Sequence, residues 1–290
     1  MRQGDSAAEV ANYQVRALER GLALLDAFSL AEPELSLTAL AARAGLAKST
    51  ATRLLAVLEA RGYLERSPDT ERYRIGVRAF ELGSLYIQTT SLEVEAQPVM
   101  AQLAHECEQT ANLGVLSGAD VVHLVVVPPD RPIRFATAVG GRDRAHATGL
   151  GKALLAALDD GALADLVARH GLPSRTARTL ATLDALRADL AVVRDRGYAF
   201  DDEEAFAGLK CVAAPIRDDK GRVVAAVSVS GPAAEFGPAN LPRYAVAVTD
   251  AARAISDRLG HRVQGARVAD GRRQTADGRG GLHRATGQRE

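Results

Sequence analysis

The chain is poor in cysteine and aromatic residues and has no long hydrophobic run. Its 290 residues include two cysteines, no tryptophan and 4% aromatic residues. Cys107 and Cys211 fit neither a metal-binding spacing nor a disulfide framework, so a reducing cytoplasm is the expected location. No apolar stretch approaches the roughly 18 residues of a membrane span, and the polar N-terminus lacks the apolar region of a signal peptide. We therefore expect neither membrane segments, metal nor cofactor.

Length and charge distribution indicate two domains of different character. A chain of 290 residues favours two domains, and 47% apolar residues suffice for buried cores. The net charge is zero, yet the segment from Arg43 to Arg78 holds eight Lys or Arg against four Asp or Glu, a local charge of +4. A local basic patch is what sequence-independent affinity for DNA phosphates requires.

Two short helical patterns, separated at Gly45, lie within this region. Ser36 to Ala44 has apolar residues at spacing three and four, and Ser36 suits the N-cap. Gly45 suits the positive φ of a turn. The second pattern, about Ala47 to Arg61, opens with cations and hydroxyls that we predict to contact DNA: Lys48, Ser49, Thr50, Thr52 and Arg53. The arrangement is typical of a helix-turn-helix, although a helical hairpin with a solvated basic face is the alternative.

The residues that follow favour the DNA-binding interpretation. Gly62 to Arg66 alternates like a strand, Ser67 to Glu71 is a turn cluster, and Arg72 to Ile75 alternates again. This pattern predicts a β-hairpin wing, with Tyr73 and Ile75 on one face and Arg72 and Arg74 on the other, directed toward DNA. A preceding amphipathic helix, Val15 to Phe28, is expected to complete the core beneath the helix-turn-helix.

The second half mixes helices and strands, which indicates an α+β domain. Expected strands include Ala111 to Leu116, Val121 to Val127 and Ile133 to Ala138. Val212 to Arg217 and Val223 to Ser230 are expected to pair through the turn at Asp218 to Gly221. The expected helices are Arg78 to Gln88, Leu92 to Glu108, Leu150 to Leu158, Gly161 to His170, Leu183 to Gly197 and Ala245 to Leu259. Tyr198 to Asp202 is expected to lead into a loop.

Several blocks resemble the IclR family of bacterial transcriptional regulators. They are LSLTALAARAGLAKSTATRLLAVLEARGYLER, RYRIGVRAFELG, HATGLGKALLA, RGYAFDDEEAFAGLKCVAAPIRD and VVAAVSVSGP. The resemblance covers about residues 13 to 260. It implies a winged helix-turn-helix domain (13–76), a linker helix (77–90) and a GAF-like effector-binding domain (91–260), with disorder expected at 1–12 and in the basic tail 261–290. It also implies a homodimer or a dimer of dimers on operator DNA, acting as a repressor that responds to a small organic acid or aromatic compound.

The resemblance also implies the positions of an effector pocket. The Gly149 turn fails the phosphate-loop pattern, because His146 occupies the first glycine position and Ala153 replaces Ser or Thr. In similar proteins this turn binds the effector carboxylate, which implicates Gly149 and Leu150, together with Asp201, Cys211, Ser228 and Ser230. His146 is expected to cap or line the pocket, and Phe135 and Asp143 to form its walls. Val227 and Val229, which alternate with the two serines, are expected to supply an apolar surround. Asp143 departs from the apolar residue of a small keto-acid pocket and favours a ligand with a hydroxyl or amine.

Each of these residues has an alternative interpretation. Gly149 is compatible with a simple tight turn, and Ser228 and Ser230 with the polar face of any strand. Cys211 resembles a small apolar filler, and Asp201 to Glu204 a solvated acidic run. An enzyme with Cys211 as nucleophile and His146 as base, and an architectural DNA-binding protein, are the competing functions. No triad or metal cluster supports the enzyme.

Overall fold

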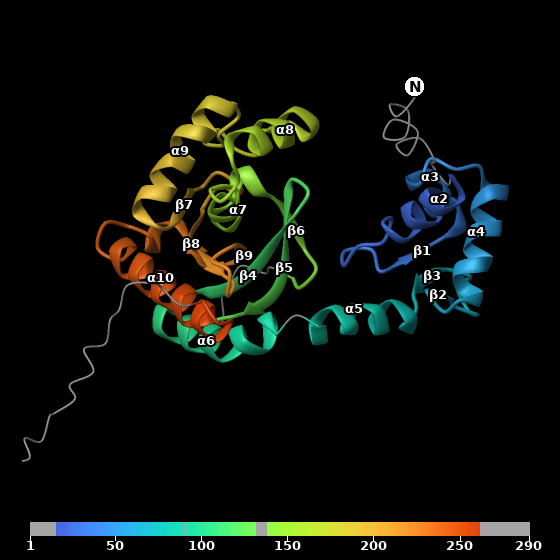
Figure 1. Cartoon of the computed structure of the whole chain (residues 1–290). Coiled ribbons are helices and arrows are strands. Elements are labelled where there is room, and N and C mark those ends of the chain that lie inside the picture. The colour runs from blue at the N-terminus through green and yellow to red at the C-terminus, as the bar shows by residue number, and fades with distance from the viewer. Residues whose placement is uncertain (1–15, 90, 132–137, 262–290) are drawn as a thin grey trace, which may run out of the picture.

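The structure, a computed structural model, describes residues 16–89, 91–131 and 138–261. Two globular parts are joined through the helix α5 (Val77–Thr89) (Figure 1). The segment expected to be disordered at 1–12, nearly all of the tail and most of the expected strand Ile133 to Ala138 lie outside the described residues. Among the helices that are described, none is long and apolar enough to cross a membrane.

The described residues of the N-terminal part form three helices and a small antiparallel sheet of strand order β1-β3-β2. Its helices are α2 (Arg16–Leu25), α3 (Leu37–Arg43) and α4 (Lys48–Ala60), and its strands are β1 (Glu34–Leu35), β2 (Leu64–Arg66) and β3 (Tyr73–Ile75). The predicted helix-turn-helix and wing are therefore both present. The short strand β1 pairs with β3, and it was not expected from the sequence.

The turn between α3 and α4 forms as the local sequence predicts. The Ser36 hydroxyl accepts a hydrogen bond from the amide of Ala39 at 3.2 Å, which caps the first turn of α3. Gly45 has a φ of +63°, a conformation that favours glycine. Leu40 and Leu55 are fully buried between the helices, so the two helices are held together by one apolar core.

The expected packing of α2 is wrong in part. Leu18 and Leu22 belong to the apolar stripe of the helix that was expected to complete the core, yet they are 61% and 51% exposed, and Leu24 is the buried residue of α2. On β3, Tyr73 is buried, and Ile75, two residues further along the strand, is exposed. The apolar stripe of α2 is therefore wider than the core that it covers, and part of it faces outward.

The C-terminal part is built on a six-stranded antiparallel sheet of order β6-β5-β4-β9-β8-β7. The strands are β4 (Thr110–Ser117), β5 (Asp120–Val127), β6 (Arg142–Arg144), β7 (Ala199–Asp202), β8 (Leu209–Arg217) and β9 (Val223–Pro232). The helices are α6 (Leu92–Cys107), α7 (Gly149–Leu155), α8 (Asp160–His170), α9 (Leu183–Arg196) and α10 (Leu241–Arg258), with short 3-10 turns η2 (Ala145–Ala147) and η3 (Ala233–Glu235). This confirms the α+β class.

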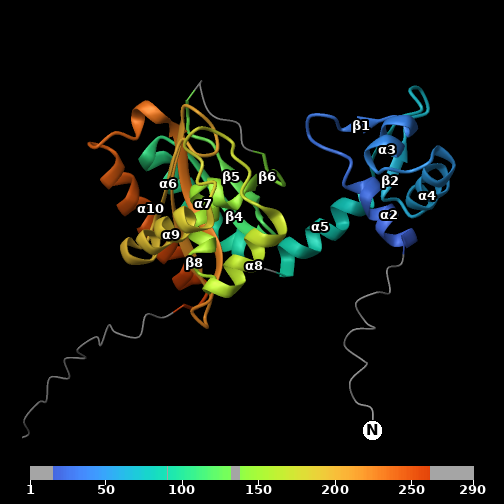
Figure 2. The ribbon, with the colours of Figure 1, turned by 90° about the horizontal axis from the view of Figure 1, so that it is seen from above.

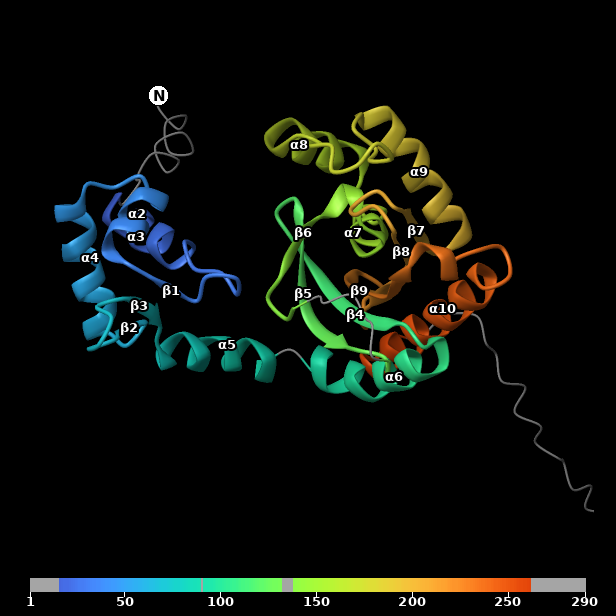
Figure 3. The same cartoon turned by 180° about the vertical axis from the view of Figure 1, so that it is seen from behind.

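The helices cover the two faces of the sheet separately. Helices α6 and α10 lie on one face, and α7, α8 and α9 lie on the other (Figures 1 and 3). Figure 2 shows α5 extending from this domain to the helix-turn-helix domain. Because successive strand residues face opposite sides, each face has its own core. Val227 and Val229 pack with α6 and α10, while Ala226 packs with α7 and α9.

Two short strands were not predicted. Residues 199–202 form β7 rather than the start of a loop, and β7 pairs with β8 so that Asp201 lies opposite Cys211. Strand β6 places Asp143 opposite Val121 of β5. Both strands lie at the edges of the sheet, and each contributes one predicted pocket residue to the face that carries α7.

Candidate DNA-binding surface and candidate effector cavity

The start of α4 presents the predicted DNA-contacting side chains to solvent. Lys48, Ser49, Thr52 and Arg53 are exposed, and Thr50 is half-buried. The Thr52 hydroxyl donates to the carbonyl of Lys48 at 2.8 Å, so this hydroxyl is already engaged within the helix. The N-terminal turns of a second helix are the part that meets base edges in helix-turn-helix proteins.

Half of the cations in the basic segment are already paired with acids. The paired residues, each with its partner, are Arg43 with Glu32, Arg66 with Glu71, Arg74 with Glu65 and Arg78 with Glu81. Lys48, Arg53, Arg61 and Arg72 form no ion pair with any described residue. These four cations are free to neutralise phosphates without first breaking an ion pair.

The wing contains both paired and unpaired arginines. Arg74 donates from Nε and Nη2 to Oε2 of Glu65, at 3.0 and 2.8 Å. Arg66 pairs with Glu71 and lies over the ring of Tyr73 at 5.6 Å. Arg72 is exposed, and its guanidinium makes no hydrogen bond to a described residue. Arg72 is therefore the better placed of the two predicted wing contacts.

A small cavity of about 60 Å³ lies on the α7 face of the large sheet. One polar side chain from each of the six strands lines it: Asp143 (β6), His123 (β5), Asn112 (β4), Ser230 (β9), Cys211 (β8) and Asp201 (β7). Thr148 and Leu150 close it from the start of α7, and Ala205, Phe206 and Leu209 add apolar surface. A row of convergent polar groups in an apolar surround is typical of small-molecule sites.

Hydrogen bonds hold the β4–β9 part of this row in place. Asn112 donates from Nδ2 to the Ser230 hydroxyl at 3.0 Å and to the carbonyl of Thr110 at 3.3 Å. Because Ser230 Oγ accepts, its own proton is free to be donated into the cavity. Thr148 is placed similarly, since its hydroxyl caps α7 by accepting from the amide of Gly151 at 3.1 Å. Both hydroxyls can therefore donate to a bound oxygen anion.

The β7 end of the row rests on a buried charge cluster. Lys152, fully buried on α7, contacts Oε1 of Glu204 and the carbonyl of Phe200, both at 2.5 Å. It also pairs with Asp189 at 3.1 Å. The amide of Glu204 donates to Oδ1 of Asp201 at 2.7 Å. Burial, which outweighs this bond, raises the pKa of Asp201 to about 7.

Most of the predicted pocket residues meet at this cavity. Asp143, Leu150, Asp201, Cys211 and Ser230 line it. Gly149 lies directly behind, where a Cβ would come within 2.9 Å of Cys211 Sγ, so this position admits no side chain without a shift. Ser228 is fully buried beside the row, opposite Asn112, and its hydroxyl has no hydrogen-bond partner among the described residues.

Other residues predicted to contribute to the pocket lie away from the cavity. His146 does not line the cavity, because the η2 turn directs Nε2 toward the carbonyl of Pro173 at 3.2 Å. Val227 and Val229, expected to supply the apolar surround, face α6 and α10 instead. Phe135 lies outside the described residues.

Sequence reasoning missed Asn112 and His123. Asn112 stands alone in an apolar strand, and a buried amide in such a strand is a signal that could have been read. His123 lies within DVVHLVVV, where the surrounding valines and leucine show no alternation that would tell which face the histidine occupies. Its face depends on the irregular pairing of β5 with β4 between Leu113 and Gly114. Thr148 and the apolar lining at 205–209 carried no local pattern.

The geometry does not favour the enzyme interpretation. Burial raises the pKa of Cys211 to about 12, so the thiol stays protonated at neutral pH and is a poor nucleophile. The proposed base, His146, is hydrogen-bonded to Pro173 away from the cavity. Within the described part of the chain, no cluster of three His, Cys, Asp or Glu is arranged to hold a metal ion.

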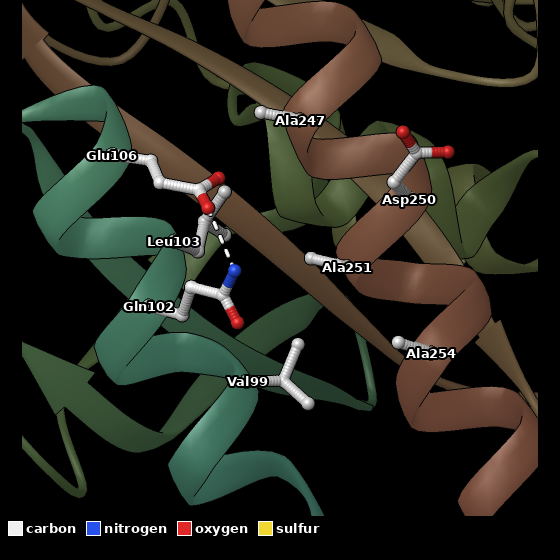
Figure 4. Close-up of a pocket in the computed structure, with 8 residues that line it drawn as sticks. All are labelled: Val99, Gln102, Leu103, Glu106, Ala247, Asp250, Ala251 and Ala254. Carbon is white, nitrogen blue, oxygen red and sulfur yellow. Dashed lines mark hydrogen bonds between the residues drawn. The ribbon is translucent and has the colours of Figure 1, made fainter.

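A second hollow, of about 210 Å³, lies between α6 and α10 (Figure 4). The α10 side is formed largely by Ala247, Ala251 and Ala254, and the polar groups at its rim include the carboxylates of Glu106 and Asp250. Both acids are exposed, and Glu106 accepts from Gln102 at 2.7 Å. An organic anion would meet two negative charges here, so this hollow is a poor candidate for its binding.

A third hollow of about 670 Å³ separates α5 from the sheet. Its lining includes Phe80 and Gly83 of α5 and Val122 and Leu124 of β5, and the lining surface is largely apolar. His123 borders both this groove and the small cavity. The wall of the cavity therefore lies next to the helix that leads to the DNA-binding domain.

Comparison with known proteins covers both domains. Residues 17–68 match the model of the IclR helix-turn-helix domain, and residues 84–257 match that of the bacterial transcriptional regulator IclR C-terminal domain. The chain is 35% identical over 248 residues to the transcriptional repressor IclR of Escherichia coli, covering 85% of this chain and 90% of that protein. It is 38% identical over 242 residues to the regulator BhcR of Paracoccus denitrificans, covering 83% and 86%.

A solved structure extends the comparison to a ligand complex. An IclR homolog from Microbacterium hydrocarbonoxydans, complexed with 4-hydroxybenzoate, is 27% identical, with a TM-score of 0.73 over 84% of this chain and 98% of that chain. Family models and relatives thus cover both domains, and they describe regulators rather than enzymes. The helix-turn-helix, the connecting helix and the sheet-based cavity belong together in one architecture: the chain is a DNA-binding member of the IclR family of bacterial transcriptional regulators.

Proposed function

We propose that this chain is a repressor of a metabolic operon and that a small organic acid, bound in the six-strand cavity, controls its affinity for operator DNA. The row of one polar side chain per strand carries the proposal. Relatives named as repressors support the sign of regulation. As a chromosomal DNA-binding protein it acts in the cytoplasm.

On the DNA side, α4 enters the major groove and the wing contacts the flanking backbone. Lys48, Ser49, Thr50, Thr52 and Arg53 supply the base and phosphate contacts of α4. Arg72 contacts phosphate directly, and Arg74 does so after leaving Glu65. The DNA-binding domain spans residues 13–76 in this assignment, with a linker at 77–90 and the effector domain at 91–260.

On the effector side, the carboxylate lies among Ser230, Ser228, Cys211 and the start of α7. The Ser230 and Ser228 hydroxyls have protons to donate, and Gly149 and Leu150 bring backbone close to Cys211. The raised pKa of Asp201, about 7, allows its carboxyl group to be protonated and neutral when a ligand anion binds beside it. The apolar lining strengthens these bonds by excluding water.

The functional unit is a homodimer, or a pair of dimers, that meets two half-sites. Leu18 and Leu22 on α2 and Val77 and Phe80 on α5 are exposed apolar side chains. The two on each helix lie three or four residues apart and so share one face of that helix, and exposed apolar patches mark association surfaces. A dimer with two-fold symmetry presents two copies of α4 to a palindromic operator.

The test uses the full-length chain and DNA from its own upstream region. Retardation of that DNA, altered by an organic acid, is the expected result. Ser228→Ala combined with Ser230→Ala is expected to retain DNA binding and lose the ligand response, with acid binding measured by calorimetry. If the double variant binds the acid as tightly as wild type, the site assignment is wrong.

A further inference from the structure

The β5–β6 side of the cavity holds a histidine–aspartate pair distant from the proposed carboxylate site. His123 lies on the same face of β5 as Val121, and Asp143 lies opposite Val121 on β6. Nε2 of His123 and Oδ2 of Asp143 are 3.0 Å apart. The pair is held by two adjacent strands, so the position of the imidazole ring is fixed.

The partner fixes the hydrogen-bonding role of the ring. A carboxylate only accepts, so Nε2 carries the proton that it donates to Asp143, and in the neutral ring Nδ1 is then an acceptor. His123 is 6% exposed, and its Nδ1 atom is buried without a hydrogen-bond partner among the described residues. A buried acceptor without a donor is costly, and it favours a ligand that supplies one.

A second unpartnered acceptor lies on the next strand. The Thr110 carbonyl fixes the orientation of the Asn112 amide, because only the NH₂ group can donate to it. Oδ1 of Asn112 is then left buried and without a partner among the described residues. The side chains of His123 and Asn112 line the same cavity, so both unpartnered acceptors belong to residues of its wall.

Strand order gives the separation of the two subsites. His123 on β5 and Ser230 on β9 are separated by β4. Two strand spacings amount to roughly 10 Å across the strands, and the pairing of Ser230 with Thr110 and of His123 with Gly114 adds an offset of four residues along them. A hydroxyl on the carbon next to the carboxylate would not reach from one subsite to the other, whereas a hydroxyl at the far end of the molecule would.

We infer that the effector is a hydroxy acid whose remote hydroxyl donates to Nδ1 of His123, which Asp143 holds in place, so that His123 is the specificity-determining residue. This rests on the organic-acid site proposed above. A hydroxyl suits the site better than an ammonium group. The Asp143 carboxylate is already engaged by His123, so a buried ammonium group would lack a counter-charge of its own.

Calorimetry on the full chain tests this with two matched ligand series. The first compares 4-hydroxybenzoate with benzoate and with 2-hydroxybenzoate, and the second compares 5-hydroxypentanoate with pentanoate. In at least one series we expect the remote hydroxyl to tighten binding about tenfold, the contribution of one well-placed hydrogen bond. The 2-hydroxy isomer, equal in composition, is expected to bind no better than benzoate.

Three variants assign the preference to His123. His123→Leu keeps a buried side chain but removes the acceptor, and we expect the hydroxyl preference to fall below about twofold while the acid without the hydroxyl binds as before. His123→Gln retains an acceptor and should keep part of the preference. His146→Leu, which alters a buried histidine outside the cavity, should leave it unchanged.

The outcomes separate the two proposals. If hydroxy and deoxy acids bind wild type equally, or the preference survives in His123→Leu, this inference is overturned and the organic-acid site stands. Tighter binding of 4-(aminomethyl)benzoate than of 4-hydroxybenzoate overturns the choice of a hydroxyl. If no acid of either series binds wild type, the organic-acid site and this inference both fail. The comparison of ligands on wild type remains decisive even if a variant does not fold.

Discussion

Asp201 is the residue whose protonation state most directly affects an anionic ligand. Burial is the main cause of its raised pKa of about 7, and the hydrogen bond from the amide of Glu204 only partly opposes it. The folded-state pKa lies above the unfolded one. The folded state therefore holds this proton more tightly, and stability falls as pH rises from about 4 through about 7.

The first prediction concerns pH. A bound carboxylate beside Asp201 favours the protonated form, so acid binding takes up a proton when pH exceeds about 7. Affinity should then fall by up to about tenfold per pH unit above 7. Asp201→Asn should flatten this dependence and raise thermal stability at pH 8 but not at pH 5. Equal pH profiles for Asp201→Asn and wild type in calorimetry would contradict the assignment.

The second prediction concerns the recognition helix. Arg53 is exposed on α4 and forms no ion pair with a described residue, so its guanidinium is available to DNA. Arg53→Ala should weaken specific operator binding by about 1 to 3 kcal/mol and leave the melting temperature unchanged. Arg43→Ala, which removes a cation already paired with Glu32, is the control and should have a smaller effect. Wild-type affinity of Arg53→Ala at fixed salt would place the contact elsewhere.

At the scale of elements, the wing carries two arginines that differ in whether they form an ion pair. Arg72 has no ion-pair partner in the described structure, while Arg74 is held by Glu65. The third prediction is that Arg72→Ala weakens binding to all DNA sequences alike and reduces the salt slope by about one unit. Arg74→Ala should do less, because DNA must compete with Glu65. Base-specific loss in Arg72→Ala would show groove reading instead of phosphate contact.

Elements with a strong local pattern were predictable from the sequence. The Ser36 cap, the Gly45 turn and the Asp218 to Gly221 hairpin each follow from residues within a few positions of one another. The alternation of Ser228 and Ser230 with valines correctly placed the two serines on one face of β9, but it also puts Val227 and Val229 on the opposite face, where they could not surround the same pocket. The exposed apolar side of α2 was not predictable, because periodicity shows that a helix has an apolar stripe but not what the stripe packs against.

The cavity was predictable only in part, and for a physical reason. Strands β6 and β7 have three and four residues, too few for a clear alternation, and their pairing at the sheet edges comes from tertiary contacts. The approach of His123 to Asp143 joins positions 20 residues apart across such an edge. Residue-by-residue resemblance located the β8 and β9 side of the cavity, whereas its β4 and β5 side required the fold.

At the scale of the whole molecule, the exposed apolar residues of α2 predict self-association. The fourth prediction is that Leu18→Lys combined with Leu22→Lys shifts the chain toward monomer in sedimentation equilibrium and weakens operator binding. Both side chains are exposed, so the fold should tolerate the change. Val192→Lys, at an exposed valine on α9, is the control. If the double variant and wild type have the same mass in solution, this face is not the interface.

Helix α5 gives the molecule the properties of a lever. With 13 residues it is about 20 Å long. Tilting a rod of this length by about 10° moves its far end by about 3.5 Å, close to the rise of one base pair along DNA. His123 lines both the groove beneath α5 and the cavity, so a ligand bound in the cavity lies close to this helix. A rotation of about 10° at that point is enough to shift a DNA-reading helix by one base pair relative to its half-site.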